Sequence, residues 1–556
     1  MNWLDYTILI GYLVAITLFG LYLSKKIKSS NSFFLGDRKF GWLVMIGQAF
    51  SAGTHAEMPV AQAGATFSLG FSTIWYQWKN MLITPFYWLI APFYRRSERT
   101  TIGEIIEDRY GRNLGFLYSV FAIAYFVSNM GVMLQGAAKV IALSTGNSFS
   151  PNNIVIAMTV AFLLYSFFGG LIASAYTNMI QAVLIIVLSM LLIPFGLHEL
   201  GGFSAMREIL PADFFKVYSS QSGMNAFNIS MLAVNGIVGI TSQPHMLTMC
   251  ATGNNERSGR VGQTYGSFVK RLCTIGWALV GLIVAALVIK DGITLSDPEM
   301  AFGYGCSRLL LPGLTGLMVS AIIAANMAAC SNYMVNTGAL FTENVYKKYF
   351  NPVAEDRKIL WIGRFSGLFL SLLAVVFALT IKNVLSAFLF TETIAAFVGI
   401  IFLGGVLWKR ANRHGALAAV IISFSVYYLL NFLYFDKVLL VYKWHPALFG
   451  WAMLAGSAAF ILVSMVTKPE KKEAMDEFFL KMRLSTDPED KNQDGTKKTA
   501  IAAGKDLLLL DITGWIRLSR WKGFFVRYRE DLGGFVLSWG FVGALILLAW
   551  AIMQIR

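Results

Sequence analysis

About 14 long apolar stretches run through the amino-acid sequence, and the segments that join them are alternately rich and poor in lysine and arginine. A helix needs about 20 apolar residues to cross the hydrocarbon core of a bilayer. The predicted spans are 3–25, 41–69, 71–95, 115–145, 152–169, 172–197, 225–251, 265–289, 309–345, 359–381, 384–408, 414–435, 445–467 and 533–554. Of the 556 residues, 56% are hydrophobic and 14% are charged. We therefore predict an all-α integral membrane protein.

The basic segments predict the orientation of the chain. The first of them carries Lys25, Lys26 and Lys28, and every second segment after it is also basic. Cytoplasmic loops of membrane proteins hold the excess of lysine and arginine, so these segments are expected in the cytoplasm and both termini outside it. The net charge of +15 follows mostly from this asymmetry and indicates a lipid bilayer, not a nucleic acid, as partner. The expected location is the inner or plasma membrane.

No pattern in the sequence indicates an enzyme or a bound cofactor. The four cysteines, Cys250, Cys273, Cys306 and Cys330, do not have the spacing of a metal site. We find no nucleophile–base arrangement and no phosphate-binding glycine loop. The chain is therefore interpreted as a protein that binds or moves a solute without transforming it.

One long cytoplasmic segment, residues 468–532, interrupts the series of spans near its end. Its part 485–498 is polar and is expected to be disordered. The segment is a candidate docking surface for a protein partner. A basic part that contains Trp521 and Lys522 is equally compatible with a position in the lipid headgroup layer.

Ionisable residues interrupt several of the predicted spans. A charge inside a bilayer is costly, so each is expected either to be paired or to serve function. His55 and Glu57 follow Ser51-Ala52-Gly53-Thr54 in the second span, Lys79 lies in the third, and Glu392 in the eleventh. Lys270 and Arg271 begin the eighth span. Arg271 is expected to extend toward the cytoplasmic headgroups, and Glu392 is a candidate partner for a lysine.

Two spans contain residues that weaken a helix. Gly53 lies within the second span, and Asn235-Gly236 and Gln243-Pro244-His245 lie within the seventh. Glycine and proline are both unfavourable in a helix interior. Two interruptions five spans apart fit a 5+5 inverted repeat with discontinuous helices, whose free backbone groups bind solute and ions. The alternative is two kinks used only for packing.

This interpretation divides the chain into seven parts. They are an N-terminal helix and loop (1–40), a first five-helix repeat (41–197), an extracellular loop (198–224), a second repeat (225–408), two peripheral helices (409–467), the basic cytoplasmic segment (468–532) and a C-terminal helix (533–556).

Four motifs carry a family resemblance. They are Ser-Phe-Phe-Leu-Gly-Asp-Arg at 32–38, the stretch 165–181 with its Gly-Gly-Leu and Ile-Gln, the stretch 321–346, and Leu-Trp-Lys-Arg at 407–410 followed by Gly415-Ala416. With these motifs in this order, the chain resembles the solute:sodium symporter family, which has a leucine-transporter-type fold. Its fourteenth span is similar to that of the sugar-transporting branch. The resemblance implies secondary transport by alternating access.

The resemblance also implies a solute site. Glu57, Asn235 and Lys270 stand at positions that contact sugar in the sugar-transporting branch, and Lys79, His55, Gln77 and Glu392 are further candidates. Val238 and Gly239 stand where sugar transporters carry aromatic residues, and Lys79 stands near the place of an acid. The pocket is therefore expected to be differently shaped and more cationic, and a sugar acid is an alternative to a neutral sugar.

The sodium site that the resemblance implies is incomplete in this sequence. Its main-chain ligands would be the carbonyls of Ser51, Thr54 and Ala325. Ala328 and Ala329 occupy the positions of its two hydroxyl residues, and Asn178 replaces an aspartate on the release route. Methyl groups cannot replace the oxygen ligands of a hard cation. Sodium coupling is therefore predicted to be weak or absent, unless a helix shift brings in Ser331 or Asn326.

Two consequences of a lost sodium site remain open. The chain could couple transport to protons through Glu57 or His55, or act as a uniporter or exchanger. Alternatively, it could be a non-transporting solute sensor or a membrane-complex subunit on the same fold.

Overall fold

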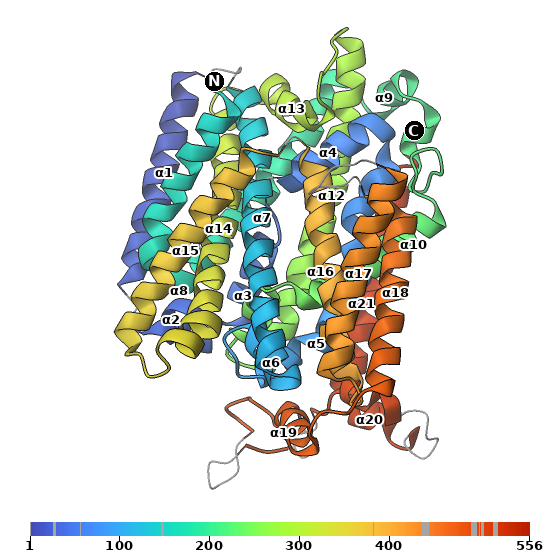
Figure 1. Ribbon diagram of the computed structural model, residues 1–556. Coiled ribbons are helices and arrows are strands. Elements are labelled where there is room, and N and C mark those ends of the chain that lie inside the picture. The colour runs from blue at the N-terminus through green and yellow to red at the C-terminus, as the bar shows by residue number, and fades with distance from the viewer. Residues whose placement is uncertain are drawn as a thin grey trace.

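The computed structural model describes residues 2–555 except 26–28, 56, 146–148, 382, 436–443, 491–496, 500, 502–504 and 515–520. The side chains of 24, 52, 165, 168–170, 178, 182, 185, 188, 189, 325, 328, 511, 513 and 514 also lie outside the described set. The described residues form helices joined by loops, with three isolated β-bridges (Figure 1). Both chain ends lie on one side of the bundle, and α19 and α20 lie on the other.

In the part of the chain that the structure describes, nine helices are long and apolar enough to cross a membrane. They are α1 (Trp3–Ser24), α7 (Arg112–Ser144), α12 (Glu256–Lys290), α14 (Leu314–Leu340) with its continuation η5 (Phe341–Phe350), α15 (Asp356–Ala378), α16 (Val384–Leu407), α17 (Arg413–Tyr434), α18 (Pro446–Val466) and α21 (Arg529–Ile552). α12 is the most enclosed of these helices, whereas α1 and α21 present most of their surface outward. The all-helical membrane architecture is therefore confirmed.

Both predicted interruptions are present. The second span is divided into α3 (Trp42–Ala52) and α4 (Glu57–Leu69), and the seventh into α10 (Ala226–Ser242) and α11 (Met246–Ala251). α10 ends two residues before Pro244, because the residue before a proline disfavours helical backbone. The main chain is thus locally free of helix at 53–55 and at 243–245.

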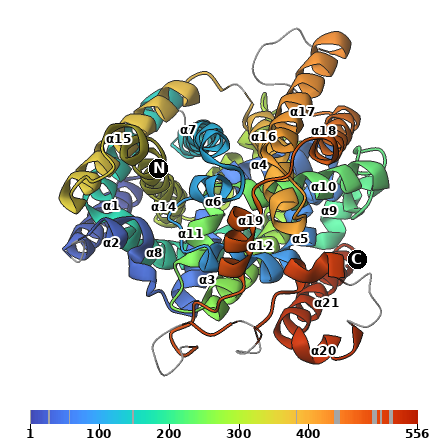
Figure 2. The same cartoon turned by 60° about the horizontal axis from the view of Figure 1, so that its bottom comes forward.

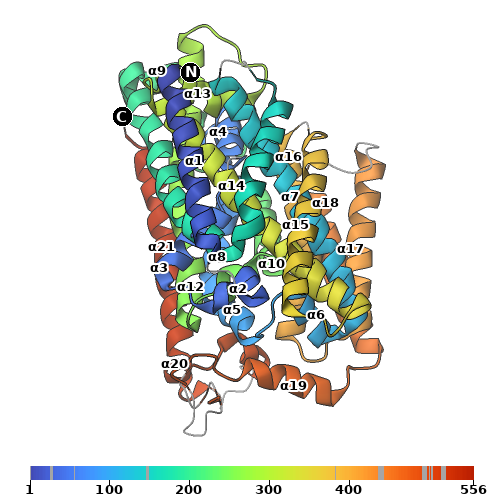
Figure 3. The same ribbon diagram turned by 90° about the vertical axis from the view of Figure 1, so that its left-hand side faces the viewer.

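Residues Pro151–Leu200 form α8, which covers two predicted spans, 152–169 and 172–197. A straight helix of 50 residues would extend about 75 Å, far beyond a bilayer. The carbonyl of Glu199 accepts a hydrogen bond from Lys290 at the end of α12 (2.7 Å), and Lys139, near the end of α7 before α8, pairs with Asp297 just beyond α12. The ring of Tyr176 contacts Phe40 near the opposite end. α8 therefore consists of two arms whose outer ends lie on one side (Figure 3).

The remaining helices are shorter or more polar. α5 (Trp75–Arg96) contains Lys79 and two prolines. The others are α2 (Ser30–Leu35), η1 (Gly36–Arg38), η2 (Phe71–Ile74), α6 (Ile102–Tyr110), α9 (Phe203–Ile209), η3 (Ala212–Phe215), η4 (Pro298–Met300), α13 (Ala301–Leu309), α19 (Lys472–Met482), η6 (Leu508–Gly514) and α20 (Phe524–Arg527).

The segment 468–532 packs against the bundle of its own chain. α19 lies across one end of α5 and α6 (Figure 2), the end that the basic segments predict to be cytoplasmic. Arg96 donates hydrogen bonds to the carbonyls of Met482 (3.1 Å) and Lys505 (2.7 Å), and Asp487 accepts one from the main-chain N–H of Glu256 (2.7 Å). The expected disorder of 485–498 is therefore wrong for 485–490, because buried polar partners hold them, while 491–496 lie outside the described residues. Docking of a separate protein here stays a prediction.

Candidate solute site

The two helix interruptions line one small cavity inside the bundle, with a volume of about 50 Å³. Gly53, His55 and Met58 reach it from the first interruption, and Gln243 and His245 from the second. Side chains of α5, α7, α12, α14 and α16 complete its wall. Residues of both interruptions therefore line the same space as polar side chains, which is the arrangement that a solute site needs.

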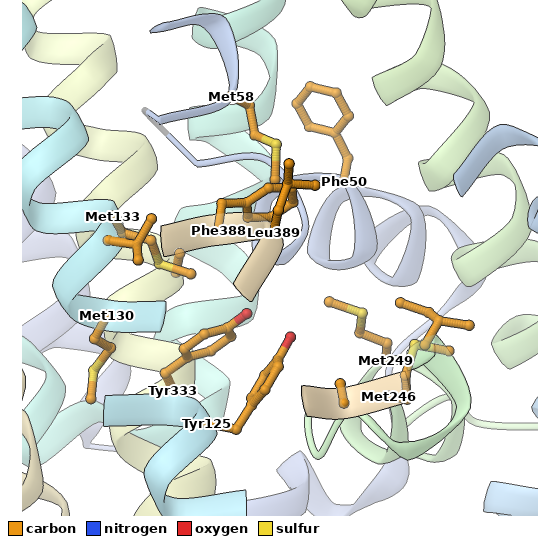
Figure 4. Packing of buried hydrophobic residues seen from close by; sticks show 14 of the residues in the cluster. Phe50, Met58, Tyr125, Met130, Met133, Met246, Met249, Tyr333, Phe388 and Leu389 are labelled. Atoms are coloured by element: carbon orange, nitrogen blue, oxygen red, sulfur yellow. The ribbon is translucent and has the colours of Figure 1, made fainter. Parts of the chain in front are cut away.

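Three aromatic rings form a stack at this cavity. The His245 ring packs against Tyr125 (6.3 Å between centroids, 21° between planes) and against Tyr333 (5.4 Å, 28°). Figure 4 shows the two tyrosines extending their hydroxyl groups into the same space, with Phe388 and Met58 beyond it. His245 Nδ1 is buried and has no hydrogen-bond partner among the described residues. The stack offers a flat ring surface and a polar rim to a bound solute.

His55 and Glu57 form a buried pair at the first interruption. His55 Nδ1 lies 2.6 Å from Glu57 Oε1, and the two side chains are 7% and 3% exposed. Glu57 Oε2 has no hydrogen-bond partner among the described residues. Glu57 packs closely on Gly136 of α7, where an added Cβ would lie 2.6 Å from the Glu57 Cβ. His55 therefore faces the cavity, and Glu57 lies behind it.

Lys79, Asn235 and Glu392 form a second buried cluster. The Lys79 ammonium pairs with Glu392 and donates a hydrogen bond to Asn235 Oδ1 (2.9 Å). The Lys79 side chain is fully buried, and only Glu392 of the three lines the cavity. Lys79 and Asn235 thus hold Glu392 in place and do not face the solute space in this conformation.

Lys270 and Arg271 supply positive charge to the cavity wall. Among the described residues, no carboxylate oxygen lies within 4.0 Å of the Lys270 ammonium or of the Arg271 guanidinium. Lys270 Nζ lies 3.7 Å from the position that a Cβ on Gly53 would take. Arg271 donates to the carbonyl of Gln77 (2.9 Å) and is buried, so the expected extension to the headgroups is wrong. Packing of α5 against α12 turns Arg271 inward, and the Gln77 side chain does not line the cavity.

Comparison with known proteins assigns the chain to a family. The family described as the sodium:solute symporter family matches residues 33–423. This chain belongs to that family. The osmoregulated proline transporter OpuE of Bacillus subtilis is 27% identical over 83% of this chain and 94% of its own length. The sodium/glucose cotransporter of Vibrio parahaemolyticus is 23% identical over 78% of this chain and 86% of its own length.

Solved structures support the same fold. The substrate-bound, outward-open structure of a Na⁺-coupled sialic acid symporter matches with a TM-score of 0.71 and 16% identity, over 85% of this chain and 99% of that one. Mhp1, a nucleobase-cation-symport-1 family transporter, matches with a TM-score of 0.53 and 13% identity. The protein is therefore a multi-pass membrane transporter-family member and not an enzyme.

The family's sodium position has few side-chain ligands in this symporter-family member. Ala329 is buried and offers only a methyl group, and the side chains of Ala325, Ala328 and Asn178 lie outside the described set. The hydroxyl groups of Thr54 and Ser331 are buried and have no hydrogen-bond partner among the described residues. Ser51 is also buried, and Asn326 donates to the carbonyl of Met133 (2.7 Å). The described part of this position thus offers two buried hydroxyl oxygens, those of Thr54 and Ser331, beside the methyl group of Ala329.

Sequence reasoning missed most of the uncharged polar residues of the cavity wall. Asn80, Asn129, Gln243, Gln263 and Ser267 all line it. Amides and hydroxyls inside spans are common and also serve helix packing, so no sequence signal separates Asn80, Asn129, Gln263 and Ser267 from others. Gln243 and His245 could have been found, because they flank Pro244 in a predicted interruption.

Proposed function

We propose that this protein is a secondary-active transporter that moves a small, negatively charged polar solute, such as a sugar acid, by alternating access. The observation that carries this proposal is the pair of cations, Lys270 and Arg271, on the cavity wall without a carboxylate partner among the described residues. Glu392 and Glu57 are already engaged by Lys79 and His55. An anionic solute would complete the charge balance that the protein leaves open.

The architecture supports alternating access. The nine long helices, the two interrupted spans, α5 and the two arms of α8 would together supply 14 crossings. The two interruptions support the 5+5 inverted repeat, in which one group of helices rocks against the other around a fixed site. Conformational change of this kind would expose the cavity to each side in turn.

The cavity chemistry supports a hydroxylated acid over an amino acid. Arg271 and Lys270 would bind the carboxylate, and Asn80, Gln243 and Asn129 would exchange hydrogen bonds with hydroxyl groups. The ring stack would pack against the flat side of a sugar ring. Among similar proteins, one is named for sialic acid and another for pantothenate, although others are named for proline and glucose.

For the driving force, we propose proton coupling through the His55–Glu57 pair, with weak or absent sodium coupling. A buried carboxylate whose second oxygen lacks a partner is costly when charged, so proton uptake on Glu57 would relieve that cost. Alanines at 328 and 329 support the loss of the sodium site. Solute-driven alkalinisation of the outside medium should disappear in Glu57→Gln and persist without sodium; a strict sodium requirement would contradict this part of the proposal.

The test of the solute class is uptake into proteoliposomes. Radiolabelled glucuronate and glucose, which differ at one carbon, are compared in wild type, Lys270→Met and the control Lys290→Met, at the exposed end of α12. We expect glucuronate uptake in wild type and control and a loss of at least about tenfold in Lys270→Met, from one charge-assisted hydrogen bond. Equal uptake of glucose, or normal uptake in Lys270→Met, would overturn the proposal. Saturable binding without uptake would favour the sensor alternative.

A further inference from the structure

A groove separate from the central cavity opens between α5, α12 and α21, and its volume is about 580 Å³. Trp88, Arg257, Tyr265 and Arg529 line it together with the α21 residues Gly534 and Leu537. α21 approaches α5 closely there, because Gly534 lacks a side chain and an added Cβ would lie 2.0 Å from the Trp88 ring. The groove is therefore a built feature of the helix packing.

In the orientation that the basic segments predict, the groove lies at the cytoplasmic interface of the bilayer. Arg257 is in the first turn of α12, next to Glu256, which pairs with Arg96 at the end of α5. Arg529 is the first residue of α21. The Trp88 indole donates a hydrogen bond to the carbonyl of Glu530 (2.9 Å). Tryptophan, tyrosine and arginine are the residues that membrane proteins place at headgroup depth.

The two arginines of the groove are available to a ligand. Both Arg257 and Arg529 are exposed, and no carboxylate among the described residues lies within 4.0 Å of their guanidinium groups. Arg260, one turn deeper on α12, behaves differently, since it is buried and pairs with Asp531 (2.5 Å). Glu530 is the acid in the groove wall, so the wall as a whole carries a net positive charge.

An apolar surface continues from the arginines toward the membrane interior. Val261 and Leu537 line the groove, and Leu537 is 53% exposed. Val536, beside it on α21, is 67% exposed. A ligand with a negative head and apolar tails would satisfy both parts of this surface at once.

We propose that this groove binds an anionic phospholipid of the cytoplasmic leaflet. Its phosphate would accept hydrogen bonds from Arg257 and Arg529, because the planar guanidinium matches phosphate geometry. Its acyl chains would lie along Val261 and Leu537. Basic pockets between spans on the cytoplasmic side are suited to such headgroups, and the anionic lipids of that leaflet supply the ligand. The site would join α21 to α5 and α12 through a lipid.

The test measures binding of dioleoylphosphatidylglycerol to the purified full-length protein by native mass spectrometry, with dioleoylphosphatidylcholine as the neutral comparison. The variant Arg257→Gln/Arg529→Gln is matched by Arg357→Gln/Lys358→Gln, which removes two exposed charges at the start of α15. At about 1 kcal/mol for each arginine, phosphatidylglycerol affinity should fall about 30-fold in the groove variant and stay near wild type in the control.

The melting temperature of each double variant without added lipid shows whether it is folded. Both double variants replace exposed residues, so both should melt at the wild-type temperature. Glycerol 1-phosphate, which has the headgroup phosphate without acyl chains, should not compete with the lipid. Equal affinity for the two lipids in wild type, equal loss in the two double variants, or competition by glycerol 1-phosphate would each overturn the lipid site.

Discussion

Buried charges at the end of the bundle that α19 covers and buried charges around the central cavity are satisfied in different ways. Arg96 is fully buried, pairs with Glu256 through two hydrogen bonds (2.9 and 2.8 Å) and also donates to two carbonyls. Lys270 and Arg271 are also buried but line the cavity without a carboxylate partner among the described residues. The comparison separates charges that hold the structure together from charges that, on the proposed function, bind the solute.

The largest effect should follow from breaking the cytoplasmic pair. Arg96→Met leaves Glu256 buried without its partner and two carbonyls without a donor, so the free energy of unfolding should fall by about 5 kcal/mol, the upper part of the range for such pairs. Denaturant unfolding in detergent micelles measures this loss. Arg357→Met, an exposed cation at the same end, should change stability little.

A second variant checks the cause of that loss. Arg96→Met/Glu256→Leu removes both charges, so it should recover part of the stability that the single variant loses. A double variant as unstable as Arg96→Met would show that the two carbonyls, not the carboxylate, dominate the cost.

The next largest loss of stability is expected for the Lys79–Glu392 pair, which is buried like Arg96–Glu256 but has one member on the cavity wall. Lys79→Met leaves Glu392 and the Asn235 amide oxygen without their cation, and should cost about 3 kcal/mol of unfolding free energy. The loss should be smaller than for Arg96, because Glu392 lines the cavity and can reach water there. Lys79→Met/Glu392→Gln should restore most of the stability. Wild-type stability in Lys79→Met would contradict the pairing.

The sequence was a good guide to the membrane architecture and a partial one to these pairings, because it predicted a lysine partner for Glu392 without identifying which lysine. Hydropathy and the distribution of lysine and arginine act along the chain, so they predict the spans directly, and Gly53 and Pro244 predict the two interruptions. Lys79 and Glu392 are far apart in the sequence, and only tertiary packing brings them together. Nothing local to either residue distinguishes a paired charge from one that contacts solute.

The same limit applies at the site. Glu57 and Asn235 were predicted as solute contacts from family positions, and Lys79 was a further candidate; none of the three lines the cavity in this conformation, and their contact with solute stays a prediction. Arg271 was expected to reach the headgroups from its place near a span end, but helix packing turns it inward. The direction of a side chain depends on the neighbouring helix, which a single sequence does not contain.

At the cavity, replacing a buried cation is expected to change the free energy of unfolding less, and in the opposite direction. Lys270→Met removes a buried cation that lacks a carboxylate partner, so the unfolding free energy should stay unchanged or rise by about 1 kcal/mol. The same denaturant unfolding measures it, with Lys290→Met as the control at the exposed end of α12. A loss comparable to that of Lys79→Met would place Lys270 among the structural charges and end the distinction between the two regions.

The smallest effect should come from the partly exposed pairs of the cytoplasmic segment. Burial alone would raise the pKa of Asp490, but hydrogen bonds from Lys505 (2.6 Å) and Ser485 (2.6 Å) outweigh it and lower the pKa below its ordinary value of 3.8. A carboxyl with a lowered pKa stabilises the folded state above its unfolded pKa, and this contribution is lost as pH falls through the folded value. Asp490→Asn should therefore cost at most about 1 kcal/mol at pH 7. The difference in melting temperature from wild type should shrink below about pH 3.8, where wild type itself takes up the proton. A difference that stays constant across this range would show that the contact depends on shape and not on charge.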